Sequence, residues 1–112
     1  MTYEIKFSGQ AEQDLRHVFE YIAYQLQSVQ TAAKQLRRIE TEIMSLETMP
    51  ERYRAYDKEP WHSRGLRVLT VNHYLVFYIP NHDTMTVEVL RIMYGGRDIE
   101  AQLDQTAEDY QA

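Results

Sequence analysis

The chain has 112 residues, of which 44% are hydrophobic and 26% are charged. This length predicts one domain with a modest core, and no apolar run approaches the roughly 20 residues that a membrane helix needs. The net charge of −5 argues against general nucleic-acid binding, and the absence of cysteine excludes disulfides and thiolate chemistry and fits a reducing cytoplasm.

The acidic excess is concentrated at the C-terminal end of the chain. Residues 98–112 contain five acidic and no basic residues, whereas residues 50–68 contain five basic and three acidic residues. We therefore expect a neutral body over residues 1–97 with a small basic region. The predicted domain spans residues 1–104, and an acidic flexible tail follows over residues 105–112. The four histidines lack ligand spacing, so neither a metal nor a cofactor is expected.

The first half of the chain predicts a short strand followed by two helices. Residues 3–7 alternate between apolar and charged side chains, which is typical of a half-buried strand. Two amphipathic segments follow, with Ser8 and Ser28 at N-cap positions and Pro50 after the second. Their apolar stripes are Ala11, Leu15, Val18, Phe19, Ile22 and Leu26, and then Ala32, Leu36, Ile39, Ile43 and Leu46. The short connection predicts an antiparallel helical hairpin.

The second half of the chain predicts a long loop and three strands. Residues 50–64 lack a clear period and carry two prolines, and ordered loops of this length are often functional. Strands are predicted over residues 66–71, 74–79 and 84–94, and one or two helical turns over residues 98–104. The order β-α-α-β-β-β predicts an α+β fold, in which an antiparallel sheet carries the helical hairpin on one face and a short C-terminal helix follows.

Four short segments occur in a characteristic order along the chain. They are A-E-x-D-L at residues 11–15, M-P-E-R at 49–52, N-x-Y-x-V-F-Y at 72–78 after Arg67, and L-R-I-x-Y-G-x-R-D at 90–98. Together they resemble the RelE/ParE superfamily of bacterial toxins, over nearly the whole chain from Tyr3 to about Leu103. The resemblance implies the toxin of a type II toxin–antitoxin pair, whose partner is a cognate antitoxin protein that wraps the toxin with a helix or an extended segment.

The resemblance leaves the target of the toxin open. RelE-like members enter the ribosome and cleave mRNA, whereas ParE-like members inhibit DNA gyrase and share the fold without the nuclease chemistry. The first interpretation implies a ribosome-dependent endoribonuclease, or mRNA interferase, with the ribosome and mRNA as partners. The alternatives are a non-enzymatic gyrase inhibitor and an attenuated member that mainly binds its antitoxin. We expect mRNA cleavage first, because the translation-blocking members vary in their catalytic residues.

RNA cleavage through the 2′-hydroxyl needs a base, an acid and positive groups that hold the developing phosphorane charge. Arginine suits the last role because its guanidinium binds phosphate through two hydrogen bonds. On the resemblance, the candidate catalytic residues are Arg67, Arg91, Tyr94 and Arg97, and the arginines are expected near the concave face of the sheet. Each has a simpler interpretation, since strand arginines are often solvated and Arg97 followed by Asp98 can form a local ion pair.

Weaker candidates lie beside the predicted strands. His62, His73 and Glu59 are considered for proton transfer, although histidines in loops and turns are usually solvated. The aromatic residues of the loop have faces on which bases could stack, but they are expected to cover the core instead. These residues are Tyr53, Tyr56 and Trp61.

The sequence differs from RelE at positions that matter for catalysis. Leu75 occupies a strand position that carries a catalytic arginine in RelE, and Leu103 lies near the position of a C-terminal tyrosine. The dense lysine cluster that RelE has in its second helix and the following loop is thin in this chain, where Lys58 is the nearest remnant. These differences and the G-x-R-D ending favour the ParE-like alternative.

Overall fold

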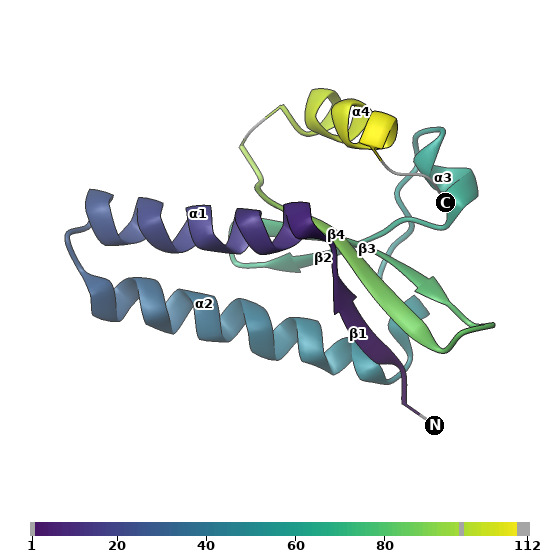
Figure 1. The fold of residues 1–112 in the computed structure, drawn as a ribbon, viewed down its shortest axis with the longest axis horizontal. Helices are drawn as coiled ribbons and strands as arrows, with labels where there is room; N and C mark the ends of the chain where they lie inside the picture. Colours follow the sequence, from purple (N-terminus) through teal and green to yellow (C-terminus); the bar gives the residue numbers. More distant parts are fainter. Residues whose placement is uncertain (1, 97, 110–112) are drawn as a thin grey trace.

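The computed structural model describes residues 2–96 and 98–109 and shows a four-stranded sheet with helices packed on both faces (Figure 1). In chain order the elements are β1 (Glu4–Phe7), α1 (Gly9–Gln25), α2 (Val29–Met44), the 3₁₀ helices η1 (Ser45–Glu47) and η2 (Pro50–Arg52), α3 (Trp61–Arg64), β2 (Arg67–Val71), β3 (Tyr74–Asn81), β4 (Thr86–Tyr94) and α4 (Ile99–Asp109). The predicted α+β class and element order are confirmed. α4 continues past its predicted end at residue 104, into the stretch predicted as an acidic tail.

The two long helices form where the sequence supplies both an apolar stripe and an N-cap. The Ser8 hydroxyl accepts a hydrogen bond from the Ala11 N–H at 3.0 Å, and Ser28 accepts one from the Thr31 N–H at 3.1 Å. These bonds satisfy first-turn donors that have no partner inside the helix. The second apolar stripe is buried as predicted at Ala32, Ile39, Ile43 and Leu46.

The strand order in the sheet is β1-β4-β3-β2. The predicted antiparallel meander is confirmed, since β2 pairs with β3 and β3 pairs with β4 in antiparallel register. β1 differs from the predicted all-antiparallel sheet, because it runs parallel to β4 from Glu4 opposite Thr86 to Phe7 opposite Val89. Alternating polarity identifies a strand but not its direction, and a parallel pair requires the long connection that separates β1 from β4.

A β-bulge in β4 changes which side chains share a face. Phe77 of β3 pairs with Arg91, and the next residue, Tyr78, pairs with Val89, so Leu90 has no partner in the register. A bulge inserts one extra residue and redirects the strand. As a result, Leu90 packs in the cluster under α4 and the adjacent Arg91 also reaches α4.

Two hydrophobic clusters lie on opposite faces of the sheet. The first cluster joins the helical hairpin to one face and includes Ala11, Val18, Ile22, Ala32, Ile39, Ile43, Leu46, Leu69, Val71, Tyr74, Val76, Tyr78, Val87, Val89 and Ile92. The second cluster lies under α3 and α4 and includes Trp61, Leu66, Val68, Phe77, Leu90, Met93 and Leu103. Alternate residues of β2 and β3 therefore supply both clusters, as the period of a strand requires.

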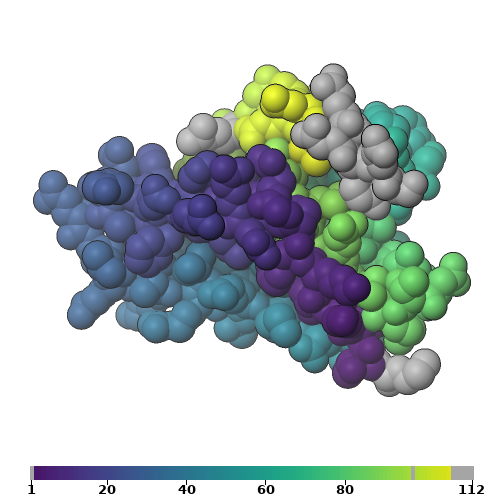
Figure 2. All heavy atoms as spheres, in the orientation of Figure 1, coloured from purple at the N-terminus to yellow at the C-terminus, as the bar shows by residue number. Residues whose placement is uncertain are grey.

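The helical hairpin projects from one side of the sheet (Figures 1 and 2). Leu26 was predicted to complete the first apolar stripe, but it is 62% exposed. The reason is that α1 ends at Gln25, at the far end of the hairpin, where the sheet no longer lies beneath the helix. Within the described ranges, no helix has the length and apolar character to cross a bilayer.

Candidate functional site

Arg91 of β4 forms a buried ion pair with Asp14 of α1. Its Nε donates to Asp14 Oδ2 at 2.7 Å, and its Nη2 donates to Asp14 Oδ1 at 3.0 Å. The two side chains are only 11% and 8% exposed. A bidentate pair with so little solvent uses the donor geometry that arginine would otherwise offer to a phosphate.

The edge of β4 explains why a carboxylate is buried at this place. β1 pairs with β4 only as far as Val89, so the later backbone groups of this edge need other partners. The Ser8 hydroxyl donates to the Leu90 carbonyl at 2.9 Å, and Asp14 Oδ2 accepts the Ile92 N–H at 2.9 Å. Ser8, the N-cap of α1, and Asp14 within α1 thus bond backbone groups of β4 beyond its pairing with β1, because buried backbone groups require hydrogen bonds.

Arg91 also connects the sheet to α4. Its Nη1 donates to the Thr106 hydroxyl at 3.0 Å. Arg91 lines two hollows, with volumes of about 500 Å³ and about 180 Å³. The larger one lies between α1, the end of β4 and α4, and its lining includes Asp14, His17, Tyr21, Tyr74, Arg91, Tyr94 and Gln102. The smaller one is lined by Gln10, Arg91, Gln102, Gln105 and Thr106.

Tyr94 stands at the rim of the larger hollow and is 47% exposed. Its ring lies 5.5 Å from that of Tyr74, edge to face, and 6.2 Å from that of His73. The Gly95 N–H donates to the His73 carbonyl at 2.7 Å, and a Cβ at Gly95 would approach that oxygen to 3.1 Å. A side chain at position 95 would therefore crowd this turn, which brings two of the candidate residues, Tyr94 and His73, close together.

Arg67 lies on the opposite face of the sheet from Arg91. Its register partner is Tyr78, which belongs to the first cluster, whereas the partner of Arg91 is Phe77, which belongs to the second. Directly paired residues share a face, so the sheet separates the two guanidinium groups. The expectation that both lie near the concave face is therefore wrong. The catalytic role of each residue stays a prediction.

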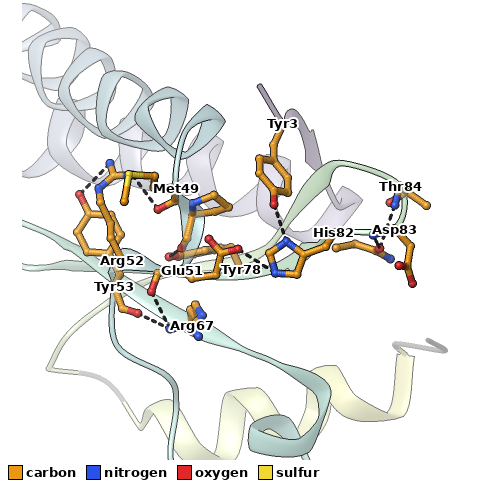
Figure 3. Close-up of polar contacts among 12 residues, drawn as sticks. Tyr3, Met49, Glu51, Arg52, Tyr53, Arg67, Tyr78, His82, Asp83 and Thr84 are labelled. Carbon is orange, nitrogen blue, oxygen red and sulfur yellow. Dashed lines mark hydrogen bonds and ion pairs between the residues drawn. The ribbon is translucent and has the colours of Figure 1, made fainter. Parts of the chain in front are cut away.

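Arg67 holds the loop that follows α2 (Figure 3). Its Nη1 donates to the Glu51 carbonyl at 3.0 Å and to the Tyr53 carbonyl at 2.6 Å. The hydroxyl of Tyr78 donates to the Pro50 carbonyl beside them. Arg52 turns the other way and donates to the carbonyls of Thr48, Met49 and Ser45 at the end of the second helix. Two of the five basic residues over residues 50–68, Arg52 and Arg67, thus bind backbone carbonyls.

Replacing Tyr78 with phenylalanine is expected to destabilise the protein by about 1 kcal/mol at neutral pH, because the Pro50 carbonyl loses its donor. Burial raises the pKa of the Tyr78 hydroxyl above its ordinary value of 10.0. Above pH 10 the unfolded chain releases this proton while the folded chain retains it, so stability falls as pH rises. Urea unfolding at pH 8 and pH 10.5 should therefore show a smaller alkaline loss in Tyr78→Phe than in the wild type. Equal losses in the two proteins would contradict this role.

Leu75 and Leu103, at which the sequence was expected to differ from RelE, both lie in the second cluster or against it. Leu75 is half-buried and packs against the second cluster, and Leu103 is a buried member of it. Trp61 connects the same region to α4, since its Nε1 donates to the Leu103 carbonyl at 3.2 Å. These positions are therefore part of the hydrophobic packing under α4. Arg97 lies outside the described residues.

The weaker loop candidates have local partners. His62 Nδ1 is hydrogen-bonded to the Tyr56 carbonyl at 2.9 Å. Hydrogen bonds from the Ser63 hydroxyl and N–H lower the pKa of the Glu59 carboxyl, which makes it a weaker base. Lys58 pairs with Glu100 of α4 at 2.7 Å, but both side chains are more than half exposed, and such pairs contribute little.

The interpretation that the loop aromatics cover the core is confirmed. Trp61 is buried in the second cluster, Tyr56 packs against this cluster, and Tyr53 packs against the first. Their burial accounts for the aromatic content of the loop without a role in base stacking.

Two polar arrangements were not predicted from the sequence. Asp14 falls on the apolar stripe of α1, one turn after Ala11, and a charge at such a position indicates a buried partner. The second arrangement joins three separate segments, because His82 contacts the Tyr3 hydroxyl through Nδ1 and lies 2.8 Å from Glu51 Oε1 through Nε2 (Figure 3). No sequence spacing links these three residues.

Comparison with known proteins identifies a family model and solved structures that this chain resembles. Residues 5–99 match the family model described as the ParE toxin of the type II toxin–antitoxin system parDE. A chromosomal ParDE system from P. aeruginosa contains a similar structure, with a TM-score of 0.68, 19% identity, and coverage of 83% of this chain and 96% of that chain. A comparison with curated protein sequences gave no match.

Two other solved structures share the fold. The free state of an E. coli RelE toxin mutant has a TM-score of 0.68 and 10% identity, and the alignment covers 99% of this chain and 100% of that chain. The toxin–antitoxin complex RelBE2 from Mycobacterium tuberculosis has a TM-score of 0.60 and 19% identity, with 84% and 99% covered. At these identities the structural likeness concerns the fold alone.

Proposed function

Because the chain belongs to the ParE toxin family of type II toxin–antitoxin systems, we propose that it arrests growth by binding DNA gyrase, without nuclease chemistry of its own. The sequence resemblance associates the ParE branch with this target. The observation that carries the proposal is the Asp14–Arg91 pair, which commits the best-placed arginine of the candidate site to an internal contact. Its partners are then a cognate antitoxin and gyrase, and its site of action is the cytoplasm.

The position of the second arginine supports the same proposal. Cleavage of RNA needs cations that converge on one phosphate, because transition-state stabilisation depends on groups already aimed at the developing charge. Arg67 lies across the sheet from Arg91 and donates to two backbone carbonyls. A protein that acts by binding needs no such convergence, so a surface of the right shape and polarity is sufficient.

A supercoiling assay with purified gyrase tests the proposal. The toxin is expected to inhibit supercoiling and to trap cleaved DNA complexes, and addition of the antitoxin should reverse both effects. A toxin preparation that binds the antitoxin but leaves supercoiling unchanged, with no trapped complex, would rule the proposal out. A folded toxin that binds the antitoxin and does not arrest growth would instead identify an attenuated member.

Ribosome-dependent mRNA cleavage is a second candidate, and one observation favours it. Tyr94 is exposed at the end of β4 beside His73, so two groups capable of proton transfer lie together on the surface. Primer extension on ribosome-bound mRNA after induction tests this candidate. New 5′ ends that disappear in Tyr94→Phe would support it, and growth arrest without new 5′ ends would exclude it.

A further inference from the structure

The far end of the helical hairpin carries an exposed apolar patch. This hairpin tip comprises residues 21–33, from the last turn of α1 to the first turn of α2. It holds four of the seven large hydrophobic side chains that are exposed in the part of the chain that the structure describes. They are Tyr21 at 57% exposure, Tyr24 at 78%, Leu26 at 62% and Val29 at 65%. Concentrated exposed apolar side chains commonly mark an interaction site.

The hairpin tip also lacks formal charge. No Asp, Glu, Lys, Arg or His occurs from residue 21 to residue 33, although Glu20 and Lys34 stand directly on either side. The centres of protein interfaces are depleted in charge and enriched in tyrosine. Nucleic acids and anionic membranes, in contrast, are bound mainly through lysine and arginine. The composition of the tip therefore fits an uncharged, apolar surface on a protein.

Hydrogen bonds within the hairpin tip hold the turn between its two helices. The Leu26 N–H donates to the Ile22 carbonyl at 3.0 Å, and Gln27 adopts a left-handed conformation with φ of 49°. Ser28 then caps α2, and its hydroxyl donates to the Thr31 hydroxyl at 2.9 Å. A surface that is ordered before binding loses little conformational entropy in the complex.

The shape of the hairpin tip distinguishes its partner from the antitoxin. The tip is convex and projects from the body of the toxin (Figures 1 and 2), so it fits a pocket on a folded protein. The larger hollow beside Arg91 is concave, and a helix or an extended segment of an antitoxin suits such a surface. Tyr21 lines this hollow as well, whereas Tyr24 and Leu26 do not.

We infer that the hairpin tip is the surface through which the toxin contacts its growth-arrest target, by inserting Tyr24 and Leu26 into an uncharged apolar pocket. Under the proposed function, on which this inference rests, that pocket belongs to DNA gyrase. The antitoxin binds elsewhere, so target contact and antitoxin contact are separable by mutation.

The double variant Tyr24→Ser/Leu26→Ser tests the inference in the full-length toxin. Both side chains are exposed, so the thermal unfolding midpoint is expected to equal that of the wild type. The concentration needed to inhibit gyrase should rise about tenfold or more, as for the loss of interface anchors, and growth arrest should disappear. Antitoxin affinity should not change. Met44→Ser is the matched control, because Met44 is 46% exposed on the same hairpin but lies at the opposite end of α2.

Three outcomes would overturn the inference. They are inhibition by the double variant at the wild-type concentration, an equal loss in Met44→Ser, and a parallel loss of antitoxin affinity. Failure of the proposed function gives a different result, because the wild type would then leave gyrase active. In that case growth arrest in cells is the measurement that tests the hairpin tip. Loss of arrest in the double variant supports contact of the tip with another target, and retained arrest rejects the inference.

Discussion

Replacement of Arg91 by glutamine is expected to destabilise the protein by about 3–5 kcal/mol, because it leaves a buried carboxylate without its cation. Asp14 is only 8% exposed, and two of its three hydrogen-bond donors belong to Arg91. A buried charge without a partner is far more costly than an exposed one. The effect should therefore exceed that of any exposed arginine in the chain.

Urea unfolding of three variants measures this effect and assigns its cause. Arg91→Gln should lose most of the stability, and Asp14→Asn/Arg91→Gln should recover much of it, because the remaining pair is neutral and the Ile92 N–H retains an acceptor. Arg38→Gln, at an exposed position of α2, is the control and should change stability by less than about 0.5 kcal/mol. A small loss in Arg91→Gln, similar to that of the control, would show that the pair does not stabilise the fold.

Replacement of Arg67 by methionine is expected to cost about 2–3 kcal/mol, the second largest effect. The substitution keeps an apolar stem of similar length but removes the donor to the Glu51 and Tyr53 carbonyls. Hydrogen bonds from charged donors contribute more than neutral ones. The loss should be local, because these bonds connect β2 to a single loop.

Unfolding measurements combined with amide hydrogen exchange test this role of Arg67. Arg67→Met should accelerate exchange in residues 51–56 and leave α1 and α2 protected. Arg67→Lys should restore part of the stability, because an ammonium group retains a donor for one of the two carbonyls. Unchanged stability and exchange in Arg67→Met, together with loss of growth arrest, would assign Arg67 to function instead.

Local patterns in the sequence account for most of the fold. Apolar spacing and the serine caps predict the hairpin, because α1 and α2 depend on contacts within a few residues. The direction of β1 and the exposure of Leu26 were not predicted, since both depend on where the sheet lies relative to a distant segment. Periodicity carries no information about such distances.

The candidate site was predicted less well than the fold, for two physical reasons. The bulge at Leu90 interrupts the alternation of β4, so counting along the strand does not reveal that Arg67 and Arg91 face opposite sides. The partner of Arg91 is 77 positions away at Asp14, and a single sequence offers only the unexplained charge on an apolar stripe as a signal. The sequence thus singled out Arg67 and Arg91 but did not identify the groups that they bind.

Growth arrest by the Asp14→Asn/Arg91→Gln variant is the most direct test of the central claim that Arg91 stabilises the fold of a toxin that acts by binding. The variant must first unfold in one cooperative transition and bind the antitoxin, which shows that it is folded. Our account then predicts that induction arrests growth and that the purified variant inhibits gyrase as strongly as the wild type. Loss of growth arrest in a variant that meets both conditions would contradict the account, because it would show that the guanidinium of Arg91 acts on the target itself.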